Sequence, residues 1–250
     1  MAVRLAAAVL IVVTVVLPGV LCRKIPSYVK LCKKSDPDFD ACVISSVEAL
    51  RPRLNKGIPK MNVPPADPFV LPALEVNRDR DAIKLRAHLQ NIVAHGGTGF
   101  VINRLKTDLD KLAVELSITL PHIRATAEYD VDCRILLGNF KGQGVFMGNF
   151  TDVKVDVKGD GKVVKRNGEE YLEVNNVKTK IRVGDSSVKI NAKDDRNGRL
   201  SESALQFYNQ NKKEVLNIVL PIVQETAEEV ITQIGNNILG SAPLSELLPA

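Results

Sequence analysis

The chain contains no tryptophan and few aromatic side chains of any kind, which make up 4% of its 250 residues. Apolar residues as a whole make up 45%. The interior must therefore be built from valine, isoleucine and leucine, which are among the residue types most often buried. An aliphatic composition of this kind suits a smooth apolar cavity, and it suits an ordinary packed core equally well.

Residues that carry chemistry are also scarce. The three histidines fall in separate parts of the chain without the spacing of metal ligands: His88, His95 and His122. No Gly-x-Ser-x-Gly nucleophile motif occurs, and Gly142-Gln143-Gly144 lacks the third glycine of a dinucleotide-binding loop. The stretch from Asp194 to Gly198 resembles a calcium-binding loop, but the glutamate of its twelfth position is missing. The sequence therefore predicts a protein that is not an enzyme and that binds neither a metal nor a cofactor.

Charge of one sign is nowhere concentrated along the sequence. The chain has 34 basic and 29 acidic residues, a formal charge of +5. The basic excess is spread along the chain and not gathered in blocks, so binding to nucleic acid receives little support and is not expected.

Long apolar runs are absent after the N-terminus. Residues 1–22 hold a single charge near their start, followed by an unbroken apolar run from Leu5 to Leu17, too short to span a bilayer. This layout is that of a secretory signal peptide cleaved after Cys22, and a retained membrane anchor is the alternative. We therefore expect a secreted, extracellular protein whose residues 23–250 form a single domain, without stable membrane insertion.

Two covalent modifications are expected in an oxidising compartment. Cys32 and Cys42 should form a disulfide, which would stabilise the fold by about 2–3 kcal/mol through its short loop. Cys133 lies in an alternating apolar pattern and is expected to be a buried thiol; the alternative is that it joins one of the pair. Asn149 begins the one glycosylation sequon, Asn-Phe-Thr, and is expected at the surface.

The first half of the expected secreted chain begins with a helix. Apolar residues recur at helical spacing from Phe39 to Leu54, behind Asp36-Pro37, and Gly57-Ile58-Pro59 ends the pattern. The five prolines between Pro59 and Pro72 exclude a helix or an inner strand there. This segment is expected to be an extended lead-in.

From residue 73 to residue 192 the apolar pattern has a period of two. Such alternation predicts antiparallel strands with one apolar and one polar face. Five alternating rows are evident, at residues 112–120, 125–135, 153–157, 177–183 and 188–192. Glycine-rich turn signals at residues 159–161, 167–168 and 184–185 divide the later rows. The glycines between Gly138 and Gly148 favour a bend or bulge over the centre of a strand.

The C-terminal part reads as one long helix, from Val215 to Leu239. Its apolar residues fill an arc of roughly 220° when each residue advances by about 100°, which is wider than the stripe of an ordinary surface helix. Pro221 predicts a kink near Asn217. A sheet with a single apolar face must bury it, and this helix is long and apolar enough to serve. The expected fold is therefore α+β, with a strongly curved antiparallel sheet wrapped around the C-terminal helix. Periodicity leaves open whether the helix fills the trough or leaves a cavity.

Several motifs in a fixed order support a family resemblance. They are the Cys32/Cys42 pair; Gly57-Ile58-Pro59 followed by Val63-Pro64-Pro65-Ala66-Asp67-Pro68-Phe69; Asn103-Arg104-Leu105-Lys106-Thr107-Asp108-Leu109; Leu116-Ser117-Ile118-Thr119-Leu120-Pro121; Gly142-Gln143-Gly144; Leu216 to Pro221; and Pro243-Leu244-Ser245-Glu246-Leu247-Leu248-Pro249. Together the motifs span nearly all of the chain beyond residue 22. The chain resembles the takeout and haemolymph juvenile hormone binding family of insects.

The resemblance implies a long helix wrapped in a curved antiparallel sheet that encloses a hydrophobic tunnel. It also implies a secreted carrier of a small lipophilic ligand, such as juvenile hormone, another terpenoid or a fatty-acid-like lipid. Cys133 has no partner for a second disulfide of the kind found in the hormone binders, which favours the takeout side of the family.

The expected binding site lies between the inner face of the sheet and the C-terminal helix. Tyr129 is the first candidate for orienting a ligand, because its ring lines a wall while its hydroxyl can pair. The other wall candidates are chosen from apolar phase alone: Phe69, Leu71, Leu116, Ile118, Val131, Phe140, Phe146, Val155, Ile181, Ile190, Val219, Ile222 and Val223. The alternative function is a protein-surface or peripheral membrane binder that uses the basic outer residues Lys154, Lys158, Lys178, Lys180 and Lys189. Oligomeric state is left open.

Overall fold

The structure, a computed structural model, describes residues 25–80, 83–135, 138–193 and 199–250. The leader expected at residues 1–22 and the calcium-like stretch at 194–198 lie outside these ranges. The helices are α1 (Phe39–Leu54), α2 (Arg199–Gln210), α3 (Lys212–Leu239) and α4 (Leu244–Leu247), with short 3-10 turns η1 (Pro59–Met61) and η2 (Gly97–Gly99). The strands are β1 (Phe69–Arg80), β2 (Ile83–His95), β3 (Val101–Asp108), β4 (Ala113–Ile135), β5 (Gly138–Arg166), β6 (Glu169–Arg182) and β7 (Asp185–Ala192).

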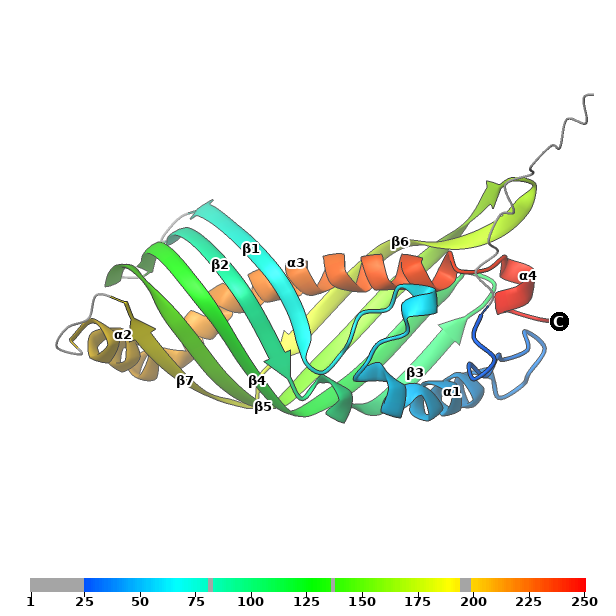
Figure 1. The fold of residues 1–250 in the computed structure, drawn as a ribbon, viewed down its shortest axis with the longest axis horizontal. Coiled ribbons are helices and arrows are strands. Elements are labelled where there is room, and N and C mark those ends of the chain that lie inside the picture. The colour runs from blue at the N-terminus through cyan, green and yellow to red at the C-terminus, as the bar shows by residue number, and fades with distance from the viewer. Residues whose placement is uncertain (1–24, 81–82, 136–137, 194–198) are drawn as a thin grey trace, which may run out of the picture.

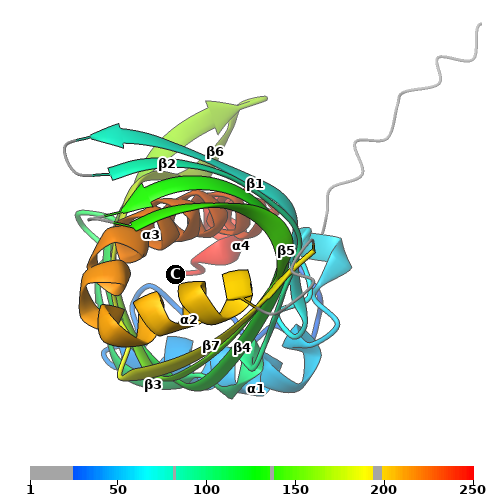
Figure 2. The same ribbon diagram turned by 90° about the vertical axis from the view of Figure 1, so that its left-hand side faces the viewer.

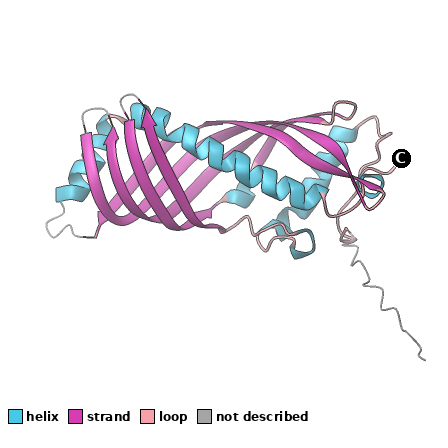
Figure 3. Cartoon of the chain, turned by 90° about the horizontal axis from the view of Figure 1, so that it is seen from above, coloured by secondary structure: helices cyan, strands magenta, loops and turns pink. Residues whose placement is uncertain are grey.

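Two long strands, β4 and β5, form the spine of one antiparallel sheet (Figure 1). At the end near α2, strands β1 and β2 extend the sheet beyond β4 and β7 extends it beyond β5. At the end near α4, β3 pairs with β4 and β6 pairs with β5. We call these two parts the α2-end half and the α4-end half. The sheet curls, and α3 runs along its length on the concave side (Figures 2 and 3).

The halves meet at an irregularity in the spine. Leu120 of β4 is half-buried, Pro121 and His122 are both exposed, and Ile123 is half-buried again. The inward-facing positions therefore shift by one residue at this point. Opposite Pro121, Asp152 of β5 has a positive φ of 48°. Irregularities of this type bend a strand pair and increase its twist, so the two halves form one curved surface.

Strand β5 is longer than its glycines suggest. The expected bend at Gly138–Gly148 and the expected turn at Gly159–Gly161 are both wrong, because β5 pairs with β4 through both segments. Glycine is needed in the first segment for close approach, not for a turn. A Cβ on Gly144 would lie 2.0 Å from the Asn191 carbonyl oxygen, and one on Gly148 would lie 2.6 Å from the Phe150 ring. The turn expected at Asn167-Gly168 is confirmed: both residues have positive φ, and they join β5 to β6.

The C-terminal helical segment is divided into two helices, α2 and α3, at a point before the proline that predicts a kink near Asn217. Pro221 lies inside an uninterrupted α3, and the break falls at Asn211, where φ is −125°. The Asn211 side chain donates a hydrogen bond of 2.9 Å to the Phe207 carbonyl and ends α2. The buried Tyr208 hydroxyl then shares a hydrogen bond of 2.7 Å with Ser186 of β7. Tertiary contacts thus turn α2 across the open end of the sheet, as Figure 2 shows.

The edge strand β1 explains how Pro72 fits into a sheet. Only one side of β1 pairs with another strand, namely β2, and a proline on an edge strand breaks no ladder bond. The extended lead-in is therefore confirmed only in part: the segment begins with the 3-10 turn η1 at Pro59–Met61, turns again at residues 66–68 and enters the sheet at Phe69. The predicted fold class, a curved antiparallel sheet around a C-terminal helix, is confirmed.

Candidate ligand-binding trough

Helix α3 is attached to the α4-end half by polar side chains. Gln224, Glu228 and Asn236 accept hydrogen bonds from the backbone N–H groups of Ile181, Thr179 and Val174, at 2.9, 2.8 and 2.8 Å. These N–H groups lie on the edge of β6 that no strand covers. Because unpaired edge N–H groups need partners, the helix substitutes for a further strand.

The same helix is attached to the α2-end half by apolar packing. Val76, Leu85 and Cys133 form a buried cluster, 8%, 8% and 7% exposed, on the inner face of β1, β2 and β4. Ile218 and Ile222 of α3 pack against this cluster, together with Phe207 of α2. Arg78 of β1 forms an ion pair with Glu225 on the solvent side of the contact.

The rest of the α3 circumference faces the concave side of the sheet. Val223 lies about 160° around the axis from Glu225 when each residue turns by about 100°. Its side chain is nevertheless 43% exposed, and no residue of α3 is classed as buried. In a close-packed interior such residues would have almost no accessible surface. Apolar surface therefore remains accessible between α3 and the sheet, and we call this region the trough.

The structure brings most of the wall candidates to the inner face, but divides them between the two halves. In the α2-end half, Phe146 lies between Ala127 and Ile190 across three strands, and Tyr129 and Val131 follow on the same face. In the α4-end half, Ile118, Val155 and Ile181 are direct cross-strand neighbours, and Leu116 follows beside Ile118. With Ile222 of α3, nine of the wall candidates lie on inward-facing sides of the sheet or helix. Val155 is buried and the other eight are half-buried: Ile118, Ile181, Leu116, Phe146, Ile190, Tyr129, Val131 and Ile222.

The remaining candidates stand differently. Phe69 and Leu71 are half-buried at the start of β1, where they pair with Ala94 and Ile92. Val219 is half-buried on α3. Phe140 lies in β5 opposite Cys133, and its side chain lies outside the described residues.

Sequence reasoning missed several inner residues of the same kind. The cluster members Val76 and Leu85 come from β1 and β2, whose alternation we did not resolve from the sequence. Val153 and Val188 are both 7% exposed on β5 and β7; each belonged to a recognised alternating row and could have been found from it. Phe207 belongs to α2, where apolar residues recur at helical spacing: Leu200, Ala204, Phe207 and Tyr208. That pattern could have identified its apolar side, but not its place in the cluster.

Cys133 is a buried free thiol, as expected. Burial raises its pKa to about 11, with a smaller contribution from the negative charge of Asp132. The thiol therefore remains protonated at neutral pH, and only the thiolate is an effective nucleophile or metal ligand. Cys133 acts as a small apolar residue in the cluster.

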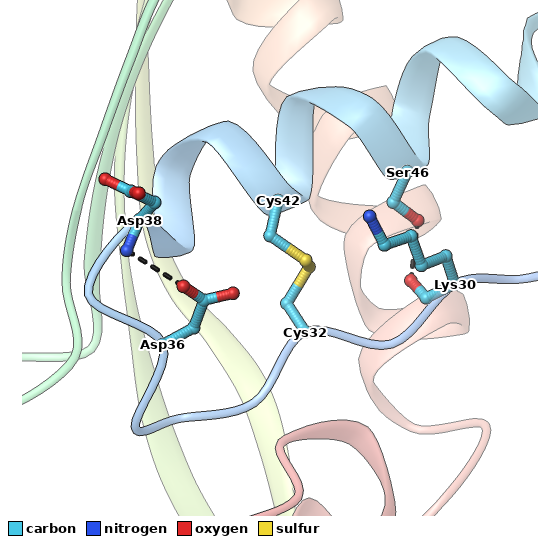
Figure 4. Close-up of a disulfide and its surroundings, with 6 residues drawn as sticks. All are labelled: Lys30, Cys32, Asp36, Asp38, Cys42 and Ser46. Carbon is cyan, nitrogen blue, oxygen red and sulfur yellow. Dashed lines mark hydrogen bonds between the residues drawn. A yellow bond between two sulfur atoms is a disulfide. The ribbon is translucent and has the colours of Figure 1, made fainter.

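The predicted disulfide between Cys32 and Cys42 is confirmed and fixes the N-terminal segment to α1 (Figure 4). Beside it, the Ser46 hydroxyl donates a hydrogen bond of 2.7 Å to the Lys30 carbonyl. The Lys34 N–H donates to the carbonyl of Pro249, at 2.8 Å. The two ends of the described chain thus meet beside α4.

A pocket of about 370 Å³ lies at this end of the molecule. Its walls are Leu109 and Leu112 from the β3–β4 connection together with Pro243, Leu244, Ser245 and Leu248 around α4, and its charged lining residues are Lys34, Glu169 and Glu170. The α4 end of the molecule therefore has an open depression. At the opposite end, α2 covers the opening of the sheet (Figure 2).

Two further features of the described residues concern possible metal ligands and membrane-spanning helices. Within them, no three His, Cys, Asp or Glu side chains gather as ligands for a metal ion. His88 and His95 lie near Glu75 and Asp67 respectively, in separate places. None of the helices in the described ranges combines the length and hydropathy of a bilayer-spanning segment. Asn149 of the sequon is exposed on β5.

Comparison with known proteins decides the family. A family model described as haemolymph juvenile hormone binding protein matches residues 7–249. The chain belongs to this family. It is similar to the circadian clock-controlled protein daywake of Drosophila yakuba, with 23% identity over 90% of this chain and 88% of the relative. It is also similar to a putative beta-carotene-binding protein of Schistocerca gregaria, with 24% identity over 88% of each chain.

Among solved structures, Takeout 1 of Epiphyas postvittana has the same fold. The TM-score is 0.70 at 23% identity, and the match covers 84% of this chain and 96% of that one. The takeout resemblance seen in the sequence motifs is thereby confirmed.

Proposed function

We propose that this protein is a secreted, non-enzymatic carrier that holds one small lipophilic molecule in the trough between α3 and the sheet. The observation that carries the proposal is the accessible apolar surface of α3 on its sheet-facing side. Val223 is 43% exposed there, although it is a large apolar side chain on a helix that the sheet surrounds. Accessible apolar surface has a free-energy cost in water, and an apolar ligand removes that cost.

The trough supplies mostly non-directional affinity. Each 100 Å² of apolar surface that the ligand buries contributes about 2.5 kcal/mol, before the cost of lost motion on association. The wall residues Ile118, Val155 and Ile181 are aliphatic and offer no hydrogen bonds to a ligand. Tyr129 is our candidate for orienting a polar end, because its phenol pairs a polar tip with an apolar ring.

The relatives support a carrier of this class. The Schistocerca gregaria relative is named for binding a carotenoid, and the family is named for juvenile hormone. A terpenoid or a fatty-acid-like lipid is therefore the ligand class we propose for this chain. Secretion is proposed from the leader pattern at residues 1–22 and agrees with the disulfide between Cys32 and Cys42, a bond that persists in oxidising compartments.

The test has two parts. Native mass spectrometry of the purified protein, followed by solvent extraction, should reveal one bound lipophile per chain. A fluorescent fatty-acid probe should then be displaced by the extracted compound. Val219→Trp, which puts an indole into the trough, should abolish uptake of the probe, with unfolding curves that remain cooperative.

Asn217→Trp is the matched control. Asn217 is exposed, and it lies on the same helix about 160° around the axis from Val219. The same bulk placed there should leave probe binding unchanged. Wild-type affinity in Val219→Trp, or equal loss in both variants, would contradict a ligand beside α3.

A further inference from the structure

The outer face of the α4-end half gathers basic residues that are scattered in the sequence. Cross-strand register places three rows there: Lys106, Glu115, Lys158 and Lys178; Arg104, Ser117, Asp156 and Lys180; Thr119, Lys154 and Arg182. The seven cations of these rows are all exposed. The rows contain two carboxylates, Glu115 and Asp156. Two more form ion pairs with Lys154 and Lys178 from beside the rows, namely Asp152 and Glu228. Seven cations against four carboxylates leave a net formal charge of +3. We call these rows the basic face.

The basic face is dense. Four strands at about 4.8 Å and five residues along each at about 3.4 Å give a patch of roughly 14 by 14 Å. Its two carboxylates respond to the surrounding cations. The hydrogen bond from Lys158 lowers the pKa of Glu115, with help from Arg104 and Lys106. Hydrogen bonds from Ser117 and Arg182 lower the pKa of Asp156 in the same way.

The α2-end half shows that this excess is not a general property of the sheet. Its exposed outer face carries six cations against six carboxylates: Lys84, Arg86, Arg124, Arg134, Lys141 and Lys189 against Glu75, Asp79, Glu128, Asp130, Asp132 and Asp185. Lys189, which we grouped with the basic residues from sequence alone, belongs to this nearly neutral half.

The register between β5 and β6 shows the same contrast between regions of the sheet. Near the hairpin tip, opposite residues have opposite charges: Lys162 faces Glu173 and Lys165 faces Glu170. Within the basic face, Lys158 faces Lys178 and Lys154 faces Arg182 directly. Like charges in these positions destabilise a sheet.

Two structural explanations for such pairs fail here. Lysines often protect an exposed edge strand from unwanted pairing, but side chains of α3 already cover the edge of β6. Local neutralisation is also incomplete. Arg104, Lys106 and Lys180 form no ion pair within the part of the chain that the structure describes. The charge is therefore available to an external anion.

We propose that the basic face docks the protein onto a lipid bilayer rich in anionic phospholipid. Five of its seven cations are lysines, which act as mobile point charges, whereas paired recognition of single carboxylates favours arginine. Groups of four to eight basic residues on one surface are typical of anionic-lipid binding. Val101, 51% exposed on the same face opposite Thr119, supplies an apolar contact at its margin.

The purpose of docking rests on the proposed carrier function: docking would bring the trough to a membrane that gives up or receives the lipophile. Binding itself needs no cargo. Vesicle binding and probe binding in solution can therefore fail independently, and each is measured by itself.

The experiment compares two triple variants of the full secreted chain. Arg104→Gln/Lys106→Gln/Lys180→Gln removes unpaired cations from the basic face. The matched control removes three cations from the α2-end half: Arg86→Gln/Arg134→Gln/Lys189→Gln. Both have the same net charge, and thermal unfolding should confirm that both are folded.

Cosedimentation is measured with vesicles of phosphatidylcholine alone and of equal parts phosphatidylcholine and phosphatidylserine. Wild type should bind only the anionic vesicles, more weakly as salt rises. Each cation near such a surface contributes roughly fivefold, so the basic-face variant should bind about a hundredfold more weakly. The control should change by less than tenfold, and probe binding in solution should be unchanged in both.

Equal losses in the two variants would mean that net charge, not the basic face, governs binding, and would overturn the proposal. Equal binding to neutral vesicles would overturn it as well. So would retention on a heparin matrix without binding to anionic vesicles, because the partner would then be a soluble polyanion.

Discussion

The two halves of the sheet hold the same helix by different forces. In the α2-end half, α3 is packed by Ile218 and Ile222 against a buried apolar cluster. In the α4-end half, it is joined to an exposed strand edge by Gln224, Glu228 and Asn236. Apolar packing is non-directional and needs a filled interface. Hydrogen bonds are directional, and those from the N–H groups of β6 fix the helix to the strand edge.

This difference explains how one helix can close both halves of the sheet by two kinds of contact. In the α4-end half, the bonds at the rim attach α3 to the strand edge, and the inner face there combines buried Val155 with half-buried Ile118 and Ile181. The α2-end half, closed by the cluster and by α2, behaves as a packed core. We expect four sets of variants to separate these roles, in decreasing order of effect.

The largest effect should come from the cluster. Leu85→Ala removes a side chain that is 8% exposed, and should lower the free energy of unfolding by about 3 kcal/mol, through lost burial and a cavity. Leu116→Ala, at a half-buried position of the α4-end half, should cost about half as much. Urea denaturation of both variants measures the contrast. Equal losses would mean that the α4-end half is packed as tightly as the cluster.

The disulfide should rank next. Cys32→Ser/Cys42→Ser should lower the free energy of unfolding by about 2–3 kcal/mol, because the unfolded chain gains freedom. The affected contacts are those of the N-terminal segment at the α4 end, where the Lys34 N–H also donates a hydrogen bond to the Pro249 carbonyl. Calorimetry with and without reductant measures it. A wild-type protein whose stability is insensitive to reduction would contradict the assignment.

Glu228 should show a smaller, pH-dependent effect. Burial opposes the charge of its carboxylate, but the hydrogen bonds from the Thr179 N–H and from Lys178 outweigh burial and lower its pKa. Its stabilisation is therefore complete above the unfolded pKa of about 4.3, and is lost as pH falls through the lower folded value. At neutral pH, Glu228→Ala should cost about 1–2 kcal/mol because an edge N–H loses its partner.

Glu228→Gln keeps an acceptor oxygen and removes only the charge. Its stability difference from wild type should shrink as denaturation is followed from pH 7 to pH 3. A constant difference across that range would show that the carboxylate charge has no part in holding the helix.

The smallest effect should come from the ion pair between Arg78 and Glu225. Their side chains are 39% and 58% exposed, so solvent screens the attraction, and Arg78→Ala should cost less than about 1 kcal/mol. A double-mutant cycle with Glu225→Ala measures the pair by itself. A coupling above that size would mean that polar contacts hold α3 in both halves.

The alternating rows made most of the sheet predictable from sequence. Residues 112–120 and 153–157 alternate strictly, and the structure pairs them in register. The rows at 125–135 and 112–120 differ in phase, and that shift marks the irregularity at Pro121. The two rows of β4 continue through Pro121, a residue type that usually interrupts a strand. The length of β5 was not predictable, because glycine serves both turns and close backbone approach. Gly144 is an instance of the second role, which depends on β7, a strand distant in sequence.

The candidate site was predictable in kind and less so in detail. Apolar phase identified Ile118, Val155 and Ile181 separately, and register alone made them neighbours. The place of Phe207 in the cluster lay beyond reach, because the break at Asn211 that orients this residue follows from contacts with β7. The basic face was hidden for the same reason, since Arg104 and Lys180 are brought together by pairing across four strands.

By itself the sequence determined which faces of the strands are apolar, the length and wide apolar arc of the last helix, the disulfide and the family. These properties follow from local periodicity and from residue type. The tertiary structure alone decided how α3 is attached to each half of the sheet, where the helical segment breaks and which cations share a face. Those outcomes depend on pairing between residues far apart in the chain, and a period of two or of 3.6 carries no information about partners.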